Sequence, residues 1–226
     1  MKRSRVRVVV RGRSRLAPAE DGLRAVHQQV LRSFATAGHA PSASALAETA
    51  ARYGITAAEA LAALHAGDYL QLGPDGQIRA AYPFSGVPTP HLIDIDGGPR
   101  VHAMCAIDAL GTAAMLGTDV TITSADPGTG EPVVVTVAVR GDRKAVWQPP
   151  TAVVFNGRQI VGEACERGAS AEVCCGYMNF FGTRASAEAW GAAHPEITGE
   201  ILGQAAALRV GVEIFGNLLE GGRTWT

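Results

Sequence analysis

A thiol and a carboxylate lie three positions apart in an apolar stretch of the chain, "AMCAIDALG" over residues 103–111. The small and aliphatic residues around them predict a buried helix from about Val101 to Leu116. Residues three apart lie on the same face of a helix, so we expect Cys105 and Asp108 to point into one pocket.

Burial of this pair favours the neutral form of both groups. No lysine or arginine lies within one helical turn of Asp108, so a buried carboxyl group there is expected to stay protonated and to act as a proton donor. Cys105 is expected to remain a thiol until a soft metal displaces its proton. The pair therefore predicts a metal-binding thiol beside a proton relay. The structural alternative is a cysteine that serves as a small core residue and an aspartate that caps the helix.

Two adjacent cysteines, Cys174 and Cys175, provide a second source of thiols in "EVCCGYMNFF". This segment is expected to be a strand, in which neighbouring side chains point to opposite faces, so only one of the two can join Cys105. Both faces carry apolar residues, and the alternation leaves open which cysteine that is. One thiolate from a helix and one from a strand give a two- or three-coordinate site, which suits Hg(II) or Cu(I) better than tetrahedral zinc.

The other candidate residues carry weaker signals. His102 could act as a base, although a capping or surface role is the more common one for such a histidine. Cys165, in polar "GEACERG", is expected to be a bystander, and Trp190 a core anchor. The chain has no CxxC pair, no cysteine and histidine set at zinc spacing and no phosphate-binding loop.

The composition indicates a globular protein. The chain has 226 residues, 47% of them hydrophobic and 18% charged, with a formal net charge of -1. That balance is enough to bury a core. No stretch approaches the roughly 18 consecutive apolar residues of a membrane span. We expect a cytoplasmic protein with no membrane association, whose four cysteines stay reduced.

The first part of the chain divides into a tail and a module. Residues 1–18 are rich in arginine and are expected to be a basic, disordered tail. Residues 19–84 predict three helices and then a hairpin, in the order of a winged helix-turn-helix. Gly38 is expected to end the first helix, Ser42 or Ser44 to cap the second, and Thr56 with Glu59 to form a capping box at the start of the third. We do not expect this module to bind DNA, because the third predicted helix, in "TAAEALAALHAGD", has no lysine or arginine to contact phosphate.

The remainder, 85–226, is expected to be the catalytic domain, with a mixed or antiparallel sheet and helices in an overall α+β fold. It opens with a linker over 85–100 that contains the strand-like "HLIDID". A hairpin follows from "DVTITSAD" and "PVVVTVAVR", then a strand at "TAVVFN". A short helix at "SAEAWGAAHPEI" and a longer one over "GEILGQAAALRVGVEIFGNLL" complete the chain.

Two segments together resemble the organomercurial (alkylmercury) lyases: "CAIDALG" at 105–111 and "CCGYMNFFGTRASAEAW" at 174–190. The three-helix module also looks like the N-terminal region of that family. The resemblance implies protonolysis of a carbon–mercury bond with no required cofactor. It implies that Cys105 and Cys174 bind the mercury and that Asp108 delivers a proton to the departing carbon. Hg(II) would stay on the cysteine pair until low-molecular-weight thiols or a mercuric reductase collect it.

Two further functions remain open from the sequence. One is a thiol-based metal-binding protein or regulator that responds to Cu(I) or Hg(II). The other is a relative that keeps the lyase scaffold but acts on another small substrate. The chain also departs from some family members, which carry a further cysteine between the two motifs, where this chain has a segment containing Ser124. The roles of the basic tail, Cys165 and Cys175 are not assigned by the residues.

Overall fold

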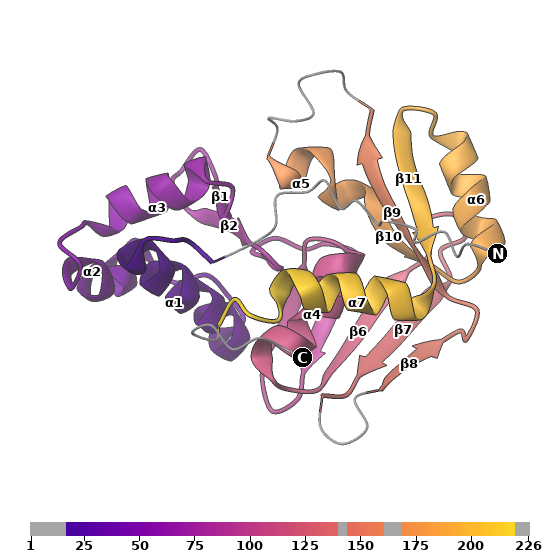
Figure 1. Cartoon of the computed structure of the whole chain (residues 1–226), viewed down its shortest axis with the longest axis horizontal. Helices are drawn as coiled ribbons and strands as arrows, with labels where there is room; N and C mark the ends of the chain where they lie inside the picture. The colour runs from indigo at the N-terminus through magenta and orange to yellow at the C-terminus, as the bar shows by residue number, and fades with distance from the viewer. Residues whose placement is uncertain (1–16, 140–143, 161–168, 220–226) are drawn as a thin grey trace, which may run out of the picture.

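The computed structural model describes residues 17–139, 144–160 and 169–219. They form an α+β fold with one eight-stranded and one three-stranded sheet, both antiparallel (Figure 1). The larger sheet contains, in spatial order, β1 (Leu70–Leu72), β2 (Ile78–Ala81), β3 (Phe84–Ser85), β5 (Arg100–Ala103), β4 (His91–Ile95), β6 (Val120–Ala125), β7 (Pro132–Val137) and β8 (Ala145–Gln148). The smaller sheet contains β10 (Met178–Phe181), β9 (Val153–Gln159) and β11 (Ile197–Leu202). The helices are α1 (Asp21–Ala37), α2 (Ala43–Ala51), α3 (Ala57–Ala66), α4 (Ala106–Leu116), α5 (Ser170–Val173), the 3-10 helix η2 (Cys175–Tyr177), α6 (Arg184–Ala193) and α7 (Gln204–Phe215).

The three predicted N-terminal helices and the hairpin after them are confirmed. Helix α1 buries one face and ends at Gly38, whose positive φ of 82° favours glycine. The hydroxyl of Ser42 accepts the first-turn N–H of Ala45 in α2. Thr56 and Glu59 form the expected capping box of α3. Strands β1 and β2 pair as the hairpin.

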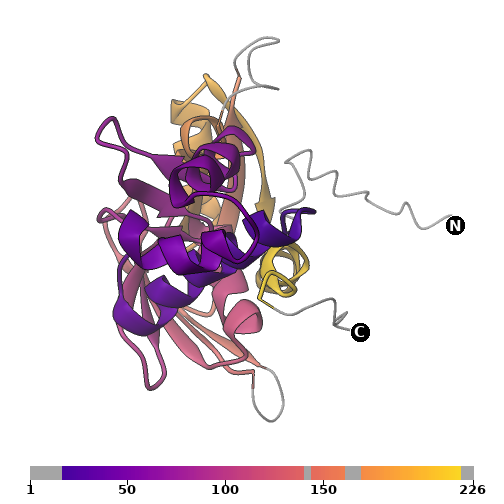
Figure 2. The same cartoon turned by 90° about the vertical axis from the view of Figure 1, so that its left-hand side faces the viewer.

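The segment 85–100 is part of the larger sheet rather than a linker. Strand β4 lies inside that sheet, paired with β5 on one side and β6 on the other. Strand β3 spans the proposed boundary between residues 84 and 85 and joins β2 to β5. The larger sheet therefore runs from the N-terminal module into the rest of the chain, and Figure 2 views it from the side of the three N-terminal helices.

Helix α4 begins at Ala106, later than the expected start near Val101. Val101 and Ala103 are buried and His102 is half-buried, which is the period-two pattern of a strand. Pairing with β4 holds these residues in β5, with Ala103 opposite His91. Cys105 is consequently the N-cap of the helix and not a residue within it.

Two expectations for the C-terminal part are also corrected. The segment "EVCCGYMNFF" is a strand only from Met178, because α5 and η2 occupy the residues around the cysteines. Residues of "GEIL" belong to β11, which pairs with β9, and the long helix starts only at Gln204. Strand β8 was not expected. Residues 1–16 of the predicted basic tail over 1–18, and Cys165, lie outside the described residues.

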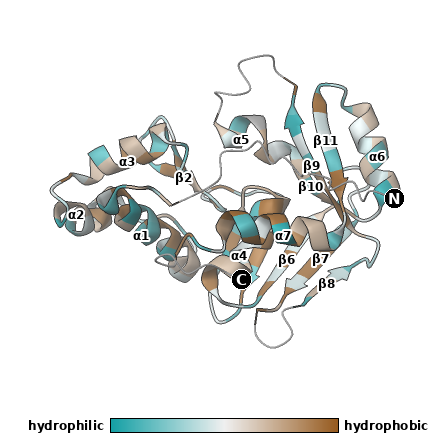
Figure 3. Cartoon of the chain, in the orientation of Figure 1, coloured by the Kyte–Doolittle hydropathy of each residue, from teal (hydrophilic) through white to brown (hydrophobic). Residues whose placement is uncertain are grey.

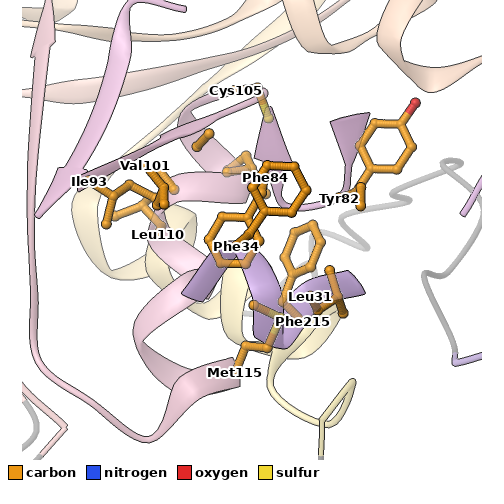
Figure 4. Close-up of a cluster of buried hydrophobic side chains, with 14 of the residues drawn as sticks. Leu31, Phe34, Tyr82, Phe84, Ile93, Val101, Cys105, Leu110, Met115 and Phe215 are labelled. Atoms are coloured by element: carbon orange, nitrogen blue, oxygen red, sulfur yellow. The ribbon is translucent and has the colours of Figure 1, made fainter. Parts of the chain in front are cut away.

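The core is built around α4, which is buried along almost its whole length. Helix α7 packs against it, and both helices carry many apolar residues (Figure 3). The two helices approach closely where Gly111 faces Gly211, since a Cβ atom on Gly111 would lie 2.5 Å from the Gly211 carbonyl oxygen. Figure 4 shows Cys105 at one side of the cluster that includes Phe34, Phe84 and Leu110. Within the described residues, no helix has the length and apolar character needed to cross a bilayer.

Candidate active site

Two sulfur atoms and a carboxylate oxygen converge at the N-terminal end of α4. One ligand atom each from Cys105, Asp108 and Cys175 lies within 4.8 Å of the other two. The three residues are nearly inaccessible to solvent, with exposed fractions of 1%, 5% and 5%. A soft metal ion bound between the sulfur atoms would therefore lie in a largely dry site beside an acid.

The N-terminal end of α4 fixes the first two groups relative to each other. Cys105 has extended backbone, and its sulfur accepts the N–H of Asp108 at 3.4 Å as a side-chain cap. The Cys105 thiol also contacts the Met178 thioether sulfur, at 3.8 Å, on the first residue of β10. Cys105 is thus held between its own helix and the strand that follows the second cysteine segment.

The second thiol at this site belongs to Cys175, whereas the family resemblance had implied Cys174. Cys174 ends α5 with φ −129° and ψ −52°, and Cys175 begins η2. The alternation argument does not apply, because the two cysteines lie in helical turns and not in a strand. Cys175 is buried and Cys174 is only half-buried. Among the described residues, the cluster of potential metal ligands includes Cys175 and does not include Cys174.

The surroundings of Cys105 favour its protonated thiol. Burial raises the pKa of Cys105 well above its ordinary value, and a hydrogen bond with Cys175 and the nearby Asp108 carboxyl raise it further. The N–H of Asp108 acts in the opposite direction, but it does not offset the burial. Cys105 is therefore a neutral thiol at physiological pH until a ligand displaces its proton.

A buried histidine supports the strand next to the site, and the sequence analysis did not single it out. His91, on β4, contacts the hydroxyl of Ser124 through Nδ1 at 3.0 Å and packs edge-on against Phe180 of β10. Burial lowers the pKa of His91 to about 4, which outweighs a hydrogen bond with Asn179. The alternation in "HLIDI" places His91 on the buried face and could have identified it. The Ser124 hydroxyl thus has a buried polar partner on β4.

Asp126 is a second buried residue that the sequence analysis missed. One of its carboxylate oxygens accepts the N–H of Gly182 at 2.9 Å, directly after β10. The other accepts the hydroxyl of Ser186 at 2.9 Å and the N–H of Gly128 at 2.8 Å. Asp126 therefore ties the turn after β6 to the far end of the strand that begins at Met178.

Among the described residues, the remaining candidates do not belong to the cluster of Cys105, Asp108 and Cys175. The Nδ1 atom of His102 accepts the N–H of Thr89 at 3.1 Å, which holds the segment between β3 and β4 against β5 and is a structural role. Trp190 packs with Phe155 and Phe181 in a second, smaller apolar cluster, as expected of a core anchor.

Comparison with known sequences identifies relatives of one kind. The alkylmercury lyase family model matches residues 84–216. The chain is 33% identical over 127 residues to an alkylmercury lyase of Staphylococcus epidermidis, a match that covers 56% of this chain and 55% of that protein. It is 34% identical over 135 residues to an alkylmercury lyase of Streptomyces lividans, covering 59% of this chain and 58% of the relative. The chain thus spans little more than half the length of these curated relatives.

A solved structure agrees over a longer part of the chain. The crystal structure of the mercury-bound form of MerB2 superposes with a TM-score of 0.67 at 25% identity. The superposition covers 89% of this chain and 100% of that one. Since the family model spans more than half of the 226 residues, from 84 to 216, the chain belongs to the alkylmercury lyase family.

Proposed function

We propose that the protein is an organomercurial lyase that cleaves a carbon–mercury bond by protonolysis at Cys105, Asp108 and Cys175. The observation that carries this proposal is the convergence of two buried sulfur atoms and a carboxylate oxygen within 4.8 Å. Mercury is a soft ion that prefers thiolate ligands, and a buried carboxylic acid beside it can supply a proton. Membership of the alkylmercury lyase family supports the same activity.

The proposed reaction balances without a redox partner. One thiol replaces the anion X of R–Hg–X and releases HX, and the second thiol then coordinates the same mercury. The proton of the second thiol passes through the Asp108 carboxyl to the carbon of R, which takes the electron pair of the broken C–Hg bond. The hydrocarbon RH leaves and Hg(II) remains bound by two thiolates. No step changes an oxidation state and both protons come from the two thiols, so the scheme needs no redox cofactor.

The chain's residues have separate roles in this scheme. The protonated Cys105 thiol carries its own proton into the reaction, because burial raises its pKa. Metal coordination then deprotonates the thiol. Asp108 is held beside Cys105 through its backbone N–H. The nearly inaccessible site limits competing protonation by water and strengthens the interaction between the acid and the developing charge on carbon.

We propose Cys175 as the second ligand and assign Cys174 no catalytic role. Cys175 lies in the cluster with Cys105, while Cys174 is half-buried at the end of α5. The choice replaces the pairing of Cys105 with Cys174 that the family resemblance implies.

We further propose that residues 19–84 are a winged-helix-like module that covers the catalytic domain over 85–226. Helix α3, "AAEALAALHA", contains no lysine or arginine, which argues against reading DNA. Low-molecular-weight thiols would remove Hg(II) from the site by ligand exchange, directly or on the way to a mercuric reductase, and the cytoplasm would supply such thiols.

The test is a product assay on the purified full chain. Phenylmercury is incubated with the protein and excess thiol, and benzene is measured in the headspace by gas chromatography. For the wild type we expect one benzene for each phenylmercury consumed, over several turnovers per protein molecule. Quantitative recovery of intact phenylmercury would overturn the proposal. If the protein does not cleave phenylmercury but binds a defined DNA fragment in a salt-dependent manner, the result would instead support a metal-responsive regulator.

A further inference from the structure

The short helix that leads into the two cysteines begins without a side-chain cap of its own. Its N-cap residue, Ala169, has no side-chain oxygen. The first turn is bound instead by two residues of the N-terminal module, far away in the sequence. The hydroxyl of Ser170 donates to Asp68 at 2.6 Å, and its N–H donates to the same carboxylate at 3.2 Å. The next N–H, of Ala171, donates to the Tyr82 hydroxyl at 3.0 Å.

Asp68 is held firmly in the position from which it binds Ser170. It lies between α3 and β1 with a positive φ of 58°, a conformation that aspartate tolerates better than most residues. Its side chain is 7% exposed and also accepts hydrogen bonds from Gln71 at 2.8 Å and from Tyr82 at 3.1 Å. A buried carboxylate with several donors is a strong and specific acceptor.

Tyr82 links the same contact to the hydrophobic core. Its ring belongs to the main core cluster and is 1% exposed. In Figure 4 its oxygen points away from the apolar side chains. The hydroxyl donates to Asp68 and accepts from Ala171, so both of its hydrogen-bonding functions are used between the module and α5.

The backbone carries this constraint from Ser170 to the cysteines. The N–H of Cys174 donates to the Ser170 carbonyl at 3.0 Å, and the N–H of Tyr177 donates to the Cys174 carbonyl at 2.9 Å. The residues from Ser170 to Tyr177 therefore form two connected helical turns, with Cys175 in the second. A displacement of Ser170 is expected to displace the Cys175 sulfur relative to Cys105, which is fixed on α4.

We propose that Asp68 and Tyr82 are positioning residues that hold the Cys175 sulfur where it can bind the same mercury ion as Cys105, within 4.8 Å of the Cys105 sulfur. The inference rests on the proposed function for the identity of the reaction. It assigns the N-terminal module a definite task in that reaction, which is to fix the second thiol. Neither residue touches the substrate in this scheme, and both act through α5.

The test compares Asp68→Asn, Tyr82→Phe and Ser170→Ala with the matched control Asp75→Asn. Asp75 is also a carboxylate of the module that accepts a backbone N–H, from Gln77 at 3.1 Å, but it is exposed in the turn between β1 and β2. For the three contact variants we expect kcat to fall about tenfold to a hundredfold with little change in KM, as a misplaced reacting group does. Asp75→Asn should match the wild type. Ser170→Thr, which keeps the hydroxyl, should retain more activity than Ser170→Ala.

A second measurement does not depend on turnover. Hg(II) alone is titrated into each reduced variant against a competing dithiol, and the reactivity of Cys175 toward a thiol reagent is followed by mass spectrometry. We expect the contact variants to bind Hg(II) at least tenfold more weakly and to label Cys175 faster than the wild type does. Asp75→Asn should be unchanged in both measurements.

The outcomes separate the positioning role from the proposed reaction and from misfolding. If the wild type binds Hg(II) but releases no hydrocarbon, the proposed function fails, while the affinity and labelling comparison still decides the positioning role. Ser170→Ala leaves the module intact and therefore serves if Asp68→Asn does not fold. The inference would be overturned if the Ser170→Ala and Tyr82→Phe variants fold and match the wild type in kcat, in Hg(II) affinity and in the rate of Cys175 labelling.

Discussion

The Sγ atoms of Cys105 and Cys175 lie within 4.8 Å of each other, although one caps α4 and the other begins the turn before β10. The separation leaves room for one ion to contact both sulfur atoms, and the Asp108 carboxyl lies within the same distance of each. Two soft ligands and one acid at a buried point are a minimal set for breaking a carbon–mercury bond.

Substitution of single cysteines distinguishes the two candidates for the second ligand. We expect Cys105→Ala and Cys175→Ala each to abolish release of benzene from phenylmercury, because each leaves mercury with one thiolate in the cluster. Cys174→Ala should retain most of the turnover. Headspace chromatography with excess thiol measures all three. If instead Cys174→Ala is inactive and Cys175→Ala is active, the second ligand is Cys174, as the family resemblance implies.

Asp108→Asn separates proton delivery from metal binding. The amide occupies the same space and keeps the backbone N–H that donates to Cys105. It cannot donate a proton as an acid, so kcat should fall by about 10²- to 10⁴-fold. Binding of Hg(II) by the two thiols should persist with a similar affinity in a competition titration. Near-normal turnover by Asp108→Asn would exclude Asp108 as the acid.

The local signals in the sequence predicted the elements that depend on short-range chemistry. Gly38, Ser42 and the pair of Thr56 and Glu59 mark helix ends, and each makes the expected contact. The association of Cys105 with Asp108 also follows from short spacing along the chain. These features need only neighbouring residues, so one sequence contains enough information to find them.

The errors concern residues whose structure is set by distant partners. The sequence predicts a helix over Val101–Ala103, because small apolar residues are compatible with either a helix or a strand. Pairing with β3 and β4 makes these residues a strand. The sequence predicts a strand for the segment with Cys174 and Cys175. The signal for a helix start is missing near this segment, because the cap of α5 comes from Asp68, far away in the sequence. Which of the two cysteines faces Cys105 depends on these helical turns. The alternation of side chains expected of a strand therefore could not identify it.

The close approach of α4 and α7 predicts a strong effect of one added methyl group. In Gly111→Ala the new Cβ would lie 2.5 Å from both the Gly211 carbonyl oxygen and a ring carbon of Phe215. The Gly211 backbone of α7 cannot move aside easily, so we expect a loss of about 1–3 kcal/mol in the free energy of unfolding. Urea denaturation followed by circular dichroism measures it. Gly203→Ser is the control, since nothing lies within 4 Å of a Cβ there. Equal stability of the two variants would contradict the packing described for α4.

His91 predicts how stability depends on pH. Burial lowers its pKa from 6.5 to about 4 in the folded protein, whereas the unfolded chain should titrate near 6.5. Between these values the unfolded state binds a proton that the folded state does not, so stability rises with pH in that range. The contribution is fully present above about pH 6.5 and is lost as the pH falls toward 4, by up to about 3 kcal/mol.

His91→Gln keeps a polar side chain facing Ser124 but cannot titrate. We therefore expect its free energy of unfolding, measured in urea from pH 7 to pH 4.5, to fall less steeply than that of the wild type. His39→Gln, at an exposed position, is the control and should follow the wild-type slope. Parallel slopes for His91→Gln and the wild type would mean that His91 takes up no proton on unfolding in this range.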